Sequence, residues 1–186
     1  GLIDEATLAR VRRQIIEPTL EGMASEGNPF RGVLYAGLML TAAGPQLIEF
    51  NARMGDPETQ AVLMRLDSDL VEIFNAVIDG KIGSTTIDWS NDSSVCIVAA
   101  SGGYPGEFET HKLITGVDEA NSLEGVVVFH AGTTRDEQGG FLTSGGRVLG
   151  VTARGAILND ARARAYGAIG KIEFEGMHYR TDIALT

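Results

Sequence analysis

Apolar residues near the start of the chain recur with the spacing of one helical face. The stripe comprises Leu8, Val11, Ile15 and Met23. Asp4 precedes the stripe at a position typical of a helix N-cap, and Pro18 lies within it. Because proline lacks the backbone N–H that a helix interior uses, the pattern predicts a helix from Asp4 that kinks or restarts at Pro18. The Gly-Asn-Pro sequence at residues 27–29 should end it.

Two runs rich in apolar residues follow, residues 32–41 and residues 47–51. The turn-forming sequence Ala-Ala-Gly-Pro lies between them at residues 42–45. Short apolar runs bounded by turn residues are typical of buried strands, so the two runs predict a β-hairpin.

Two helices should follow the hairpin. Asp56 as the N-cap and Pro57 at the first helical position predict one helix, which extends to about Arg65. Asp69 predicts the N-cap of a second helix, and Gly80 predicts its end.

The composition changes to a polar, turn-rich stretch at residues 83–94, which predicts a domain boundary near residue 88. Short strands and one helix are expected beyond it. The strands are predicted at residues 95–100, 126–129 and 147–153, and the helix at residues 159–172. This pattern indicates an α+β arrangement, a compact sheet with a covering helix.

Composition narrows the function classes. The 186 residues suffice for one large or two small domains. The formal charge of −10 repels phosphate backbones and anionic lipid surfaces, so neither nucleic acid nor a membrane is an expected partner. The longest apolar run, Val95–Ala100, is too short to span a bilayer. Cys96 is the single cysteine, which excludes an intrachain disulfide and a cysteine-rich zinc site and fits a reducing, cytoplasmic location.

Alternation along the second predicted strand places Glu49 and Asn51 on one face and Ile48 and Phe50 on the other, which should be the buried face. Arg53 continues the polar face if the chain stays extended. Carboxylate and amide oxygens two residues apart can converge on one hard cation, and Mg²⁺ usually completes such a site with water and substrate phosphate. Spacing alone favours a different interpretation, a solvated edge strand in which Arg53 pairs with Glu49.

Other candidate sites are weaker. The glycine clusters at residues 101–106, 139–140 and 145–146 lack the order of a dinucleotide or Walker loop and are expected to be turns. The three histidines are far apart in the sequence, which argues against a zinc site. Cys96 lies between Val95 and Ile97 and is expected in the core.

Residues 34–70, LYAGLMLTAAGPQLIEFNARMGDPETQAVLMRLDSDL, resemble the phosphoribosylamine-glycine ligase (glycinamide ribonucleotide synthetase) family of the ATP-grasp superfamily. The resemblance continues upstream in IIEPTLEGMASEG and downstream in AASGGYPG, FHAGTT and SGGRVLGVTARG. These strings cover nearly the whole chain, and they match the C-terminal half of the family.

The resemblance implies an α+β fold. Residues 1–87 would form the C-terminal portion of an ATP-grasp domain, with antiparallel strands and helices, and residues 88–186 a small α+β C-terminal domain. The implied reaction is a step of de novo purine biosynthesis. ATP phosphorylates glycine, and the amine of 5-phosphoribosylamine attacks the glycyl phosphate to give glycinamide ribonucleotide.

On the matching positions, the resemblance implies that Glu49 and Asn51 are ligands of Mg²⁺ or Mn²⁺ and that Arg53 is a catalytic residue that stabilises charge beside the acyl phosphate. ATP would be a co-substrate, with glycine and phosphoribosylamine as the other small-molecule substrates. The family's N-terminal substrate domain and the lysine-bearing half of its nucleotide clamp have no match here. The missing N-terminal half of the same protein is therefore an expected partner, and the residues that bind ATP stay open.

Two alternatives remain. A carboxylase-type or other ATP-grasp enzyme would have a similar metal strand and GRVL-like segment, although the GDPETQ sequence at residues 55–60 favours the glycine ligase. The second half could instead be a non-catalytic carrier or structural module. A carrier needs a modifiable lysine at a hairpin tip, and neither Lys112 nor Lys171 is expected at one.

Overall fold

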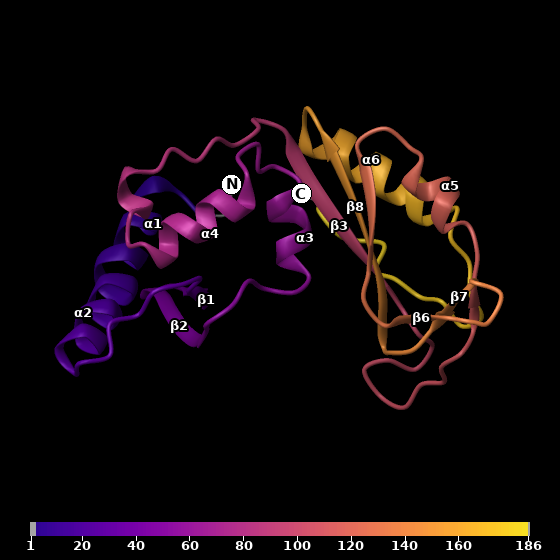
Figure 1. Ribbon diagram of the computed structural model, residues 1–186, viewed down its shortest axis with the longest axis horizontal. Helices are drawn as coiled ribbons and strands as arrows, with labels where there is room; N and C mark the ends of the chain where they lie inside the picture. Colours follow the sequence, from indigo (N-terminus) through magenta and orange to yellow (C-terminus); the bar gives the residue numbers. More distant parts are fainter. Residues whose placement is uncertain (1–2, 186) are drawn as a thin grey trace. The chain divides into compact units, whose positions relative to one another are not determined.

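The computed structural model describes residues 3–185, which form two compact units (Figure 1). The first unit comprises the residues up to Gly55 together with Asp69–Thr86, and the second comprises Asp56–Ser68 together with the residues from Ile87 onward. Both units combine antiparallel strands with helices, which confirms the α+β class. As a division between domains, the boundary near residue 88 stays a prediction.

The first helical stretch begins as predicted. Asp4 caps α1 (Glu5–Val11) by accepting a hydrogen bond from the Thr7 N–H at 2.8 Å. A π-helical turn, η1 (Arg12–Ile16), joins α1 to α2 (Glu17–Ser25), and Pro18 lies in the first turn of α2. The Glu17 N–H donates to the Arg12 carbonyl, the longer spacing of a π turn. The helix was predicted to kink or restart at Pro18. In the structure this π turn, which lies just before the proline, interrupts the helix.

Strands β1 (Tyr35–Thr41) and β2 (Gly44–Asn51) pair antiparallel as the predicted hairpin. The register shifts between Gly37 and Leu38, which pair with Glu49 and Leu47, so Ile48 is the extra residue of a β-bulge. Ile48 is 63% exposed, and the expectation that it is buried is wrong. A bulge interrupts the alternation of faces on which that expectation rested.

The two helices after the hairpin differ in how they begin. Asp69 caps α4 (Leu70–Ile78) by accepting from the N–H groups of the next turn, as predicted, and Gly80 follows with φ +71°. Helix α3 (Glu58–Leu63) has Pro57 as its N-cap, so the predictions of Asp56 as N-cap and Pro57 as first helical residue are wrong.

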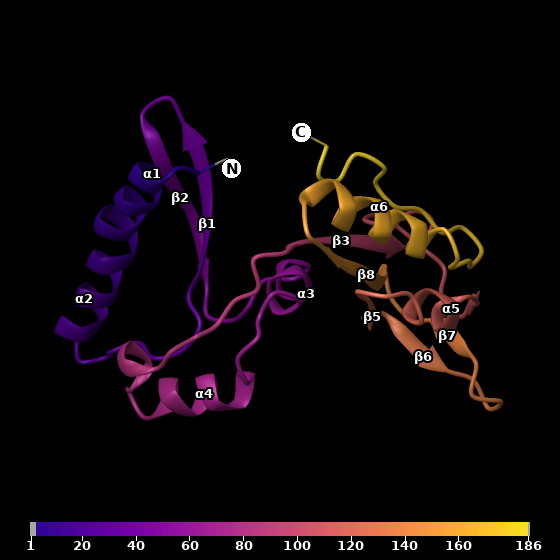
Figure 2. The same cartoon turned by 90° about the horizontal axis from the view of Figure 1, so that it is seen from above.

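The second unit contains two three-stranded antiparallel sheets. Its strands are β3 (Ser93–Ala100), β4 (Leu113–Ile114), β5 (Val126–His130), β6 (Thr133–Arg135), β7 (Phe141–Thr143) and β8 (Arg147–Gly155). One sheet has the order β3-β8-β5 and the other β4-β7-β6. Helix α6 (Leu158–Ile169) lies along β3 and β8 (Figures 1 and 2), and α5 (Val117–Asn121) contacts β5. The three predicted strands and the predicted helix are confirmed with small shifts at their ends.

The hydrophobic core lies between α6 and the β3-β8-β5 sheet. Ile97, Val151 and Ile169 are fully buried there. Gly155 at the end of β8 allows the helix close to the sheet, because a Cβ there would lie only 2.6 Å from the Ala161 backbone nitrogen. Strand β8, the central strand, is buried over most of its length.

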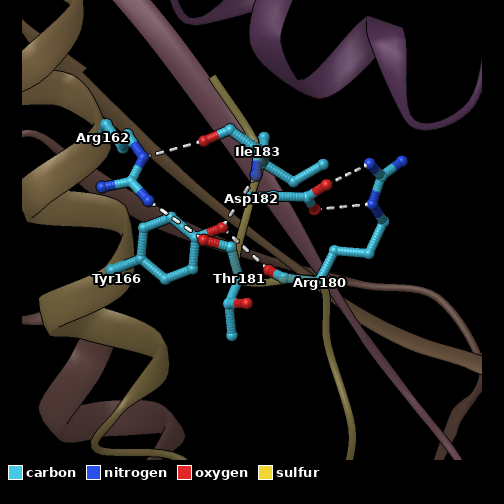
Figure 3. A network of polar contacts seen from close by, with 6 residues as sticks. All are labelled: Arg162, Tyr166, Arg180, Thr181, Asp182 and Ile183. Atoms are coloured by element: carbon cyan, nitrogen blue, oxygen red, sulfur yellow. Dashed lines mark hydrogen bonds and ion pairs between the residues drawn. The ribbon is translucent and has the colours of Figure 1, made fainter. Parts of the chain in front are cut away.

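The C-terminal segment is fastened to α6 by two side chains (Figure 3). Arg162 donates from Nε to the Ile183 carbonyl at 2.9 Å and from Nη2 to the Thr181 carbonyl at 3.0 Å. The Tyr166 hydroxyl donates to the Arg180 carbonyl at 2.8 Å and accepts from the Ile183 N–H at 3.1 Å. These bonds satisfy backbone groups that lie outside any helix or strand.

The first unit buries far less apolar surface. Among its described residues, the buried side chains are those of Val11 and Pro45. Several large hydrophobic residues of β1, β2 and α4 are exposed, among them Met39, Leu40 and Ile78. Within residues 3–185, no helix combines the length and apolar character that crossing a bilayer would need.

Candidate functional site

Three polar side chains meet at the end of β2. Asn51 donates from Nδ2 to Glu49 Oε1 at 2.9 Å, and Arg53 donates from Nη2 to Asn51 Oδ1 at 3.2 Å. Arg53 also donates from Nη1 to the Met54 carbonyl at 3.1 Å, which holds its guanidinium near the turn after the strand. Glu49 and Arg53 are exposed and Asn51 is half-buried. The structure thus brings together the three residues singled out from the sequence.

Gly37 makes room for this group. It pairs with Glu49 across the hairpin, and a Cβ at position 37 would lie 3.3 Å from Glu49 Cγ. A larger residue would therefore press on the Glu49 side chain. Sequence reasoning missed Gly37, although a glycine inside a strand commonly marks a close approach.

The donor set fits a hard divalent cation. Glu49 offers two carboxylate oxygens and Asn51 an amide oxygen, which are ligands that Mg²⁺ and Mn²⁺ accept. Within residues 3–185 there is no group of three or more His, Cys, Asp or Glu side chains that could hold a metal by itself. Because Mg²⁺ commonly takes one or two protein oxygens and completes its shell with water and phosphate, two ligands suffice when a phosphorylated substrate is present.

Asp56, five residues after Asn51, is held from two directions. Its Oδ2 lies 3.0 Å from Arg147 Nη2, and its Oδ1 accepts from Gln60 Nε2 at 3.0 Å. Arg147 also donates from Nη1 to the Asp56 carbonyl at 2.8 Å. This ion pair explains why Asp56 does not cap α3, because its carboxylate is already engaged by a cation 91 residues further along the chain.

The glycine clusters lie in turns and bends between the strands, as predicted. Ser101 donates from its N–H to the Gly146 carbonyl and from Oγ to the Gly145 carbonyl, both at 2.8 Å. A Cβ at Gly146 would overlap the Tyr104 ring, and one at Gly132 would lie 2.7 Å from Gly145 Cα. Close packing against a side-chain ring and against backbone therefore accounts for glycine at positions 146 and 132.

The histidines His111 and His130 and the cysteine Cys96 each have their own surroundings. His111 contacts Thr110 and His130 contacts Thr133 through their side chains. Burial lowers the pKa of His130, and the nearby Arg135 lowers it further. Cys96 is half-buried on β3, and burial raises the pKa of its thiol.

Both lysines considered as carrier sites lie outside hairpin tips. Lys112 precedes β4 and forms ion pairs with Glu109 at 2.7 Å and Glu175 at 3.1 Å. Lys171 follows α6 and pairs with Glu119. The second unit therefore does not present either lysine as a lipoyl- or biotinyl-type carrier would.

Comparison with known proteins places these features in context. Two family models match the chain, "Phosphoribosylglycinamide synthetase, ATP-grasp (A) domain" at residues 1–59 and "Phosphoribosylglycinamide synthetase, C domain" at residues 94–186. The phosphoribosylamine-glycine ligase of Caulobacter vibrioides is 50% identical over 183 residues, which cover 98% of this chain and 43% of that protein. The chain thus spans less than half the length of this relative.

Solved structures agree with the family match. The crystal structure of phosphoribosylamine-glycine ligase from Thermotoga maritima superposes with a TM-score of 0.81 and 34% sequence identity, covering 99% of this chain and 45% of that one. A biotin carboxylase from Campylobacter jejuni matches 96% of this chain and 38% of its own length, with a TM-score of 0.60 and 15% identity. At that identity the second likeness concerns the fold alone.

Proposed function

Because the chain belongs to the phosphoribosylglycinamide synthetase family, we propose that it is the C-terminal part of a phosphoribosylamine-glycine ligase. The full-length protein would join glycine to 5-phosphoribosylamine at the expense of ATP and form glycinamide ribonucleotide in de novo purine biosynthesis. The observation that carries this proposal beyond family membership is the hydrogen-bonded group of Glu49, Asn51 and Arg53 at the end of β2. Its oxygen ligands and its adjacent cation suit the transfer of a phosphoryl group.

Glu49 and Asn51 would hold Mg²⁺ or Mn²⁺ in this proposal, in place of the hydrogen bond that now joins them. A divalent cation there would neutralise charge on the ATP phosphates. Glu49 would contribute a full negative charge and Asn51 a neutral oxygen. The pairing of Glu49 with Gly37 in the hairpin keeps the carboxylate in position for this task.

Arg53 would stabilise the acyl phosphate. Its guanidinium is always charged and carries donors in a planar fork that matches two oxygens of a phosphate or carboxylate. The bonds to Asn51 and Met54 hold the guanidinium beside the metal ligands before substrate arrives. Such preorganised donors are worth more in catalysis than mobile ones, because they need no rearrangement as charge develops.

The proposal extends to the protein's organisation. Residues 1–87 would belong to the ATP-grasp domain and residues 88–186 to the C-terminal domain. The rest of the protein would supply the remaining nucleotide contacts, and the location would be cytoplasmic. A carboxylase-type activity is the second candidate, but the likeness to biotin carboxylase rests on 15% identity, whereas the ligase relatives reach 50%.

Replacing Glu49 by Ala in the full-length protein tests the proposal. Loss of a metal ligand should reduce ATP- and glycine-dependent formation of glycinamide ribonucleotide at least about a hundredfold, while the exposed position leaves folding intact. Glu72→Ala is the matched control, since Glu72 is an exposed glutamate of the same unit and should retain activity. Product formation and melting temperature should be measured together. Full activity of the Glu49→Ala protein at ordinary magnesium would contradict the metal assignment.

A further inference from the structure

Gly37 lies inside β1, directly across the hairpin from Glu49. A glycine inside a strand weakens it, because glycine loses the most conformational freedom on folding and offers no side chain to pack. Gly37 does not have a positive φ, the backbone conformation that favours glycine. Its backbone therefore does not explain why this position carries no side chain.

The face on which Gly37 lies is the face of the candidate metal ligands. Paired residues of an antiparallel sheet project on the same side, so Gly37 shares its face with Glu49, and Tyr35 shares that face with Asn51. Met39, two residues after Gly37 on β1, continues the same face. Gly37 is thus a gap between two large side chains of β1, and the gap lies opposite Glu49.

The Glu49 side chain occupies this gap. A Cβ at position 37 would lie 3.3 Å from Glu49 Cγ, closer than ordinary van der Waals contact, whereas the Glu49 carbonyl oxygen and nitrogen would be 3.6 Å and 3.9 Å away. From Cγ the side chain reaches Asn51, where Oε1 accepts from Nδ2 at 2.9 Å. A methyl group at position 37 would therefore displace the Glu49 side chain by a few tenths of an ångström and leave its backbone in place.

A displacement of that size matters for the choice of cation. Mg²⁺ takes oxygen ligands at about 2.0–2.1 Å in near-ideal octahedral geometry, whereas Ca²⁺ takes them at about 2.3–2.6 Å in flexible geometry. The two ligand distances differ by a few tenths of an ångström, which is the shift that a methyl group at position 37 would impose.

We propose that Gly37 is a positioning residue which, by leaving room for the Glu49 side chain, makes the site favour Mg²⁺ over larger cations. This inference rests on the proposed ligase function, in which Glu49 and Asn51 hold the metal. Gly37 has no side chain of its own, so it acts through Glu49.

The dependence on Glu49 can be tested directly. In the double variant Gly37→Ala/Glu49→Ala, the change at position 37 should have no effect on cation binding beyond that of Glu49→Ala, which is the behaviour of two residues that work as one unit. A substitution that merely disturbed the hairpin would add an effect of its own.

Gly83 provides a matched control in the same unit. It is exposed, it has no positive φ, and nothing lies within 4 Å of the position its Cβ would occupy. Gly83→Ala makes the same chemical change as Gly37→Ala, without a neighbouring side chain to displace. It should leave the cation preference unchanged.

The experiment measures ADP binding to the full-length protein by calorimetry with Mg²⁺, with Ca²⁺ and with EDTA. The gain in ADP affinity that each cation gives over EDTA reports how well the site holds that cation. We expect Gly37→Ala to lower the Mg²⁺ gain at least about fivefold relative to the Ca²⁺ gain, because Mg²⁺ tolerates misplaced ligands poorly. ADP affinity in EDTA and the melting temperature should not fall, since alanine suits a strand at least as well as glycine.

Four results would overturn the inference alone: a wild-type ratio of the two gains in Gly37→Ala, an equal fall of that ratio in Gly83→Ala, a further fall when Gly37→Ala is added to Glu49→Ala, or a Gly37→Ala protein that unfolds. If wild-type full-length protein forms no glycinamide ribonucleotide, the proposed function fails and this inference fails with it. Because product formation and cation preference are measured separately, the two failures are distinguishable.

Discussion

Arg53 shows how a single side chain links structure to chemistry. Its guanidinium bonds to Asn51 and to the Met54 carbonyl, and both contacts depend on a fork of donors that lysine lacks. Arg53→Lys in the full-length protein should therefore lose most of its ligase activity, by about tenfold or more, while its melting temperature changes little, because Arg53 is exposed. Steady-state kinetics and thermal unfolding measure the two effects. If the variant unfolds while its folded fraction keeps normal specific activity, Arg53 is a structural residue.

Cys96 provides a second prediction at the scale of one residue. Burial raises the pKa of its thiol, and the negative charges of Asp56 and Glu58 raise it further, although the neighbouring Thr152 side chain opposes the shift. A raised pKa leaves little thiolate at neutral pH, and thiolate is the reactive form. Cys96 should therefore react with iodoacetamide at pH 7.5 much more slowly in the native chain than in urea. Equal rates in both states, followed by mass spectrometry, would show that Cys96 is accessible and ionised.

Asp56 and Asp69 show what sequence can and cannot predict about single residues. Both are aspartates that precede a helix, and the N-cap pattern predicts the same role for both. Asp69 caps its helix, whereas Arg147 engages Asp56 across 91 residues of sequence. Local rules describe contacts between neighbours, so they cannot anticipate a long-range ion pair. The common face of Glu49 and Asn51 followed from strand alternation, but their role as metal ligands came from the family resemblance.

At the scale of elements, long periodic segments were predicted well and short ones were not. Strands β3 and β8 and helix α6 have eight or more residues with clear patterns. Strands β4, β6 and β7 have two or three residues, which is too few for any periodicity to show. The bulge at Ile48 escaped prediction for a related reason. Its position depends on how two strands pair, and neither strand encodes that by itself.

Gly132 supplies a prediction for the turn between β5 and β6. Its N–H donates to the Arg147 carbonyl at 2.8 Å, and a Cβ there would lie 2.7 Å from both that oxygen and Gly145 Cα. These are backbone atoms that cannot move aside, so Gly132→Ala should lower the free energy of unfolding by about 1–3 kcal/mol. Urea unfolding of the chain measures it.

Gly167 is the matched control for that substitution. It lies in the last turn of α6 with nothing within 4 Å of the position its Cβ would occupy. Gly167→Ala should therefore raise the free energy of unfolding by about 0.5–1 kcal/mol, because alanine loses less backbone freedom in a helix. Two alanine variants with effects of the same sign and size would show that the close approach at Gly132 relaxes easily.

At the scale of the whole molecule, the two units differ in how much they bury. The second unit has a continuous core, whereas the described part of the first buries only the side chains of Val11 and Pro45. Its two-stranded sheet and helix α4 leave Met39, Leu40 and Ile78 exposed. Open strand edges and contiguous apolar surface are typical of surfaces that another part of a protein covers. The chain spans 43% of the length of a relative that is 50% identical to it. The remaining part of such a protein would be long enough to cover these apolar residues.

The last prediction concerns nucleotide binding by the chain alone. The resemblance implies that ATP lies between two halves of the ATP-grasp domain, and the proposal assigns Glu49, Asn51 and Arg53 to the metal-bearing side. Calorimetry of the isolated chain with ATP and Mg²⁺ should show millimolar or weaker binding, because a few exposed ligands cannot offset the entropy lost on association. Adding the N-terminal half in trans should restore part of the turnover and cover the exposed apolar residues. Micromolar binding by the isolated chain would mean that its own residues complete a nucleotide site, and a separate nucleotide-binding function would then explain the group at the end of β2 better than half of a ligase.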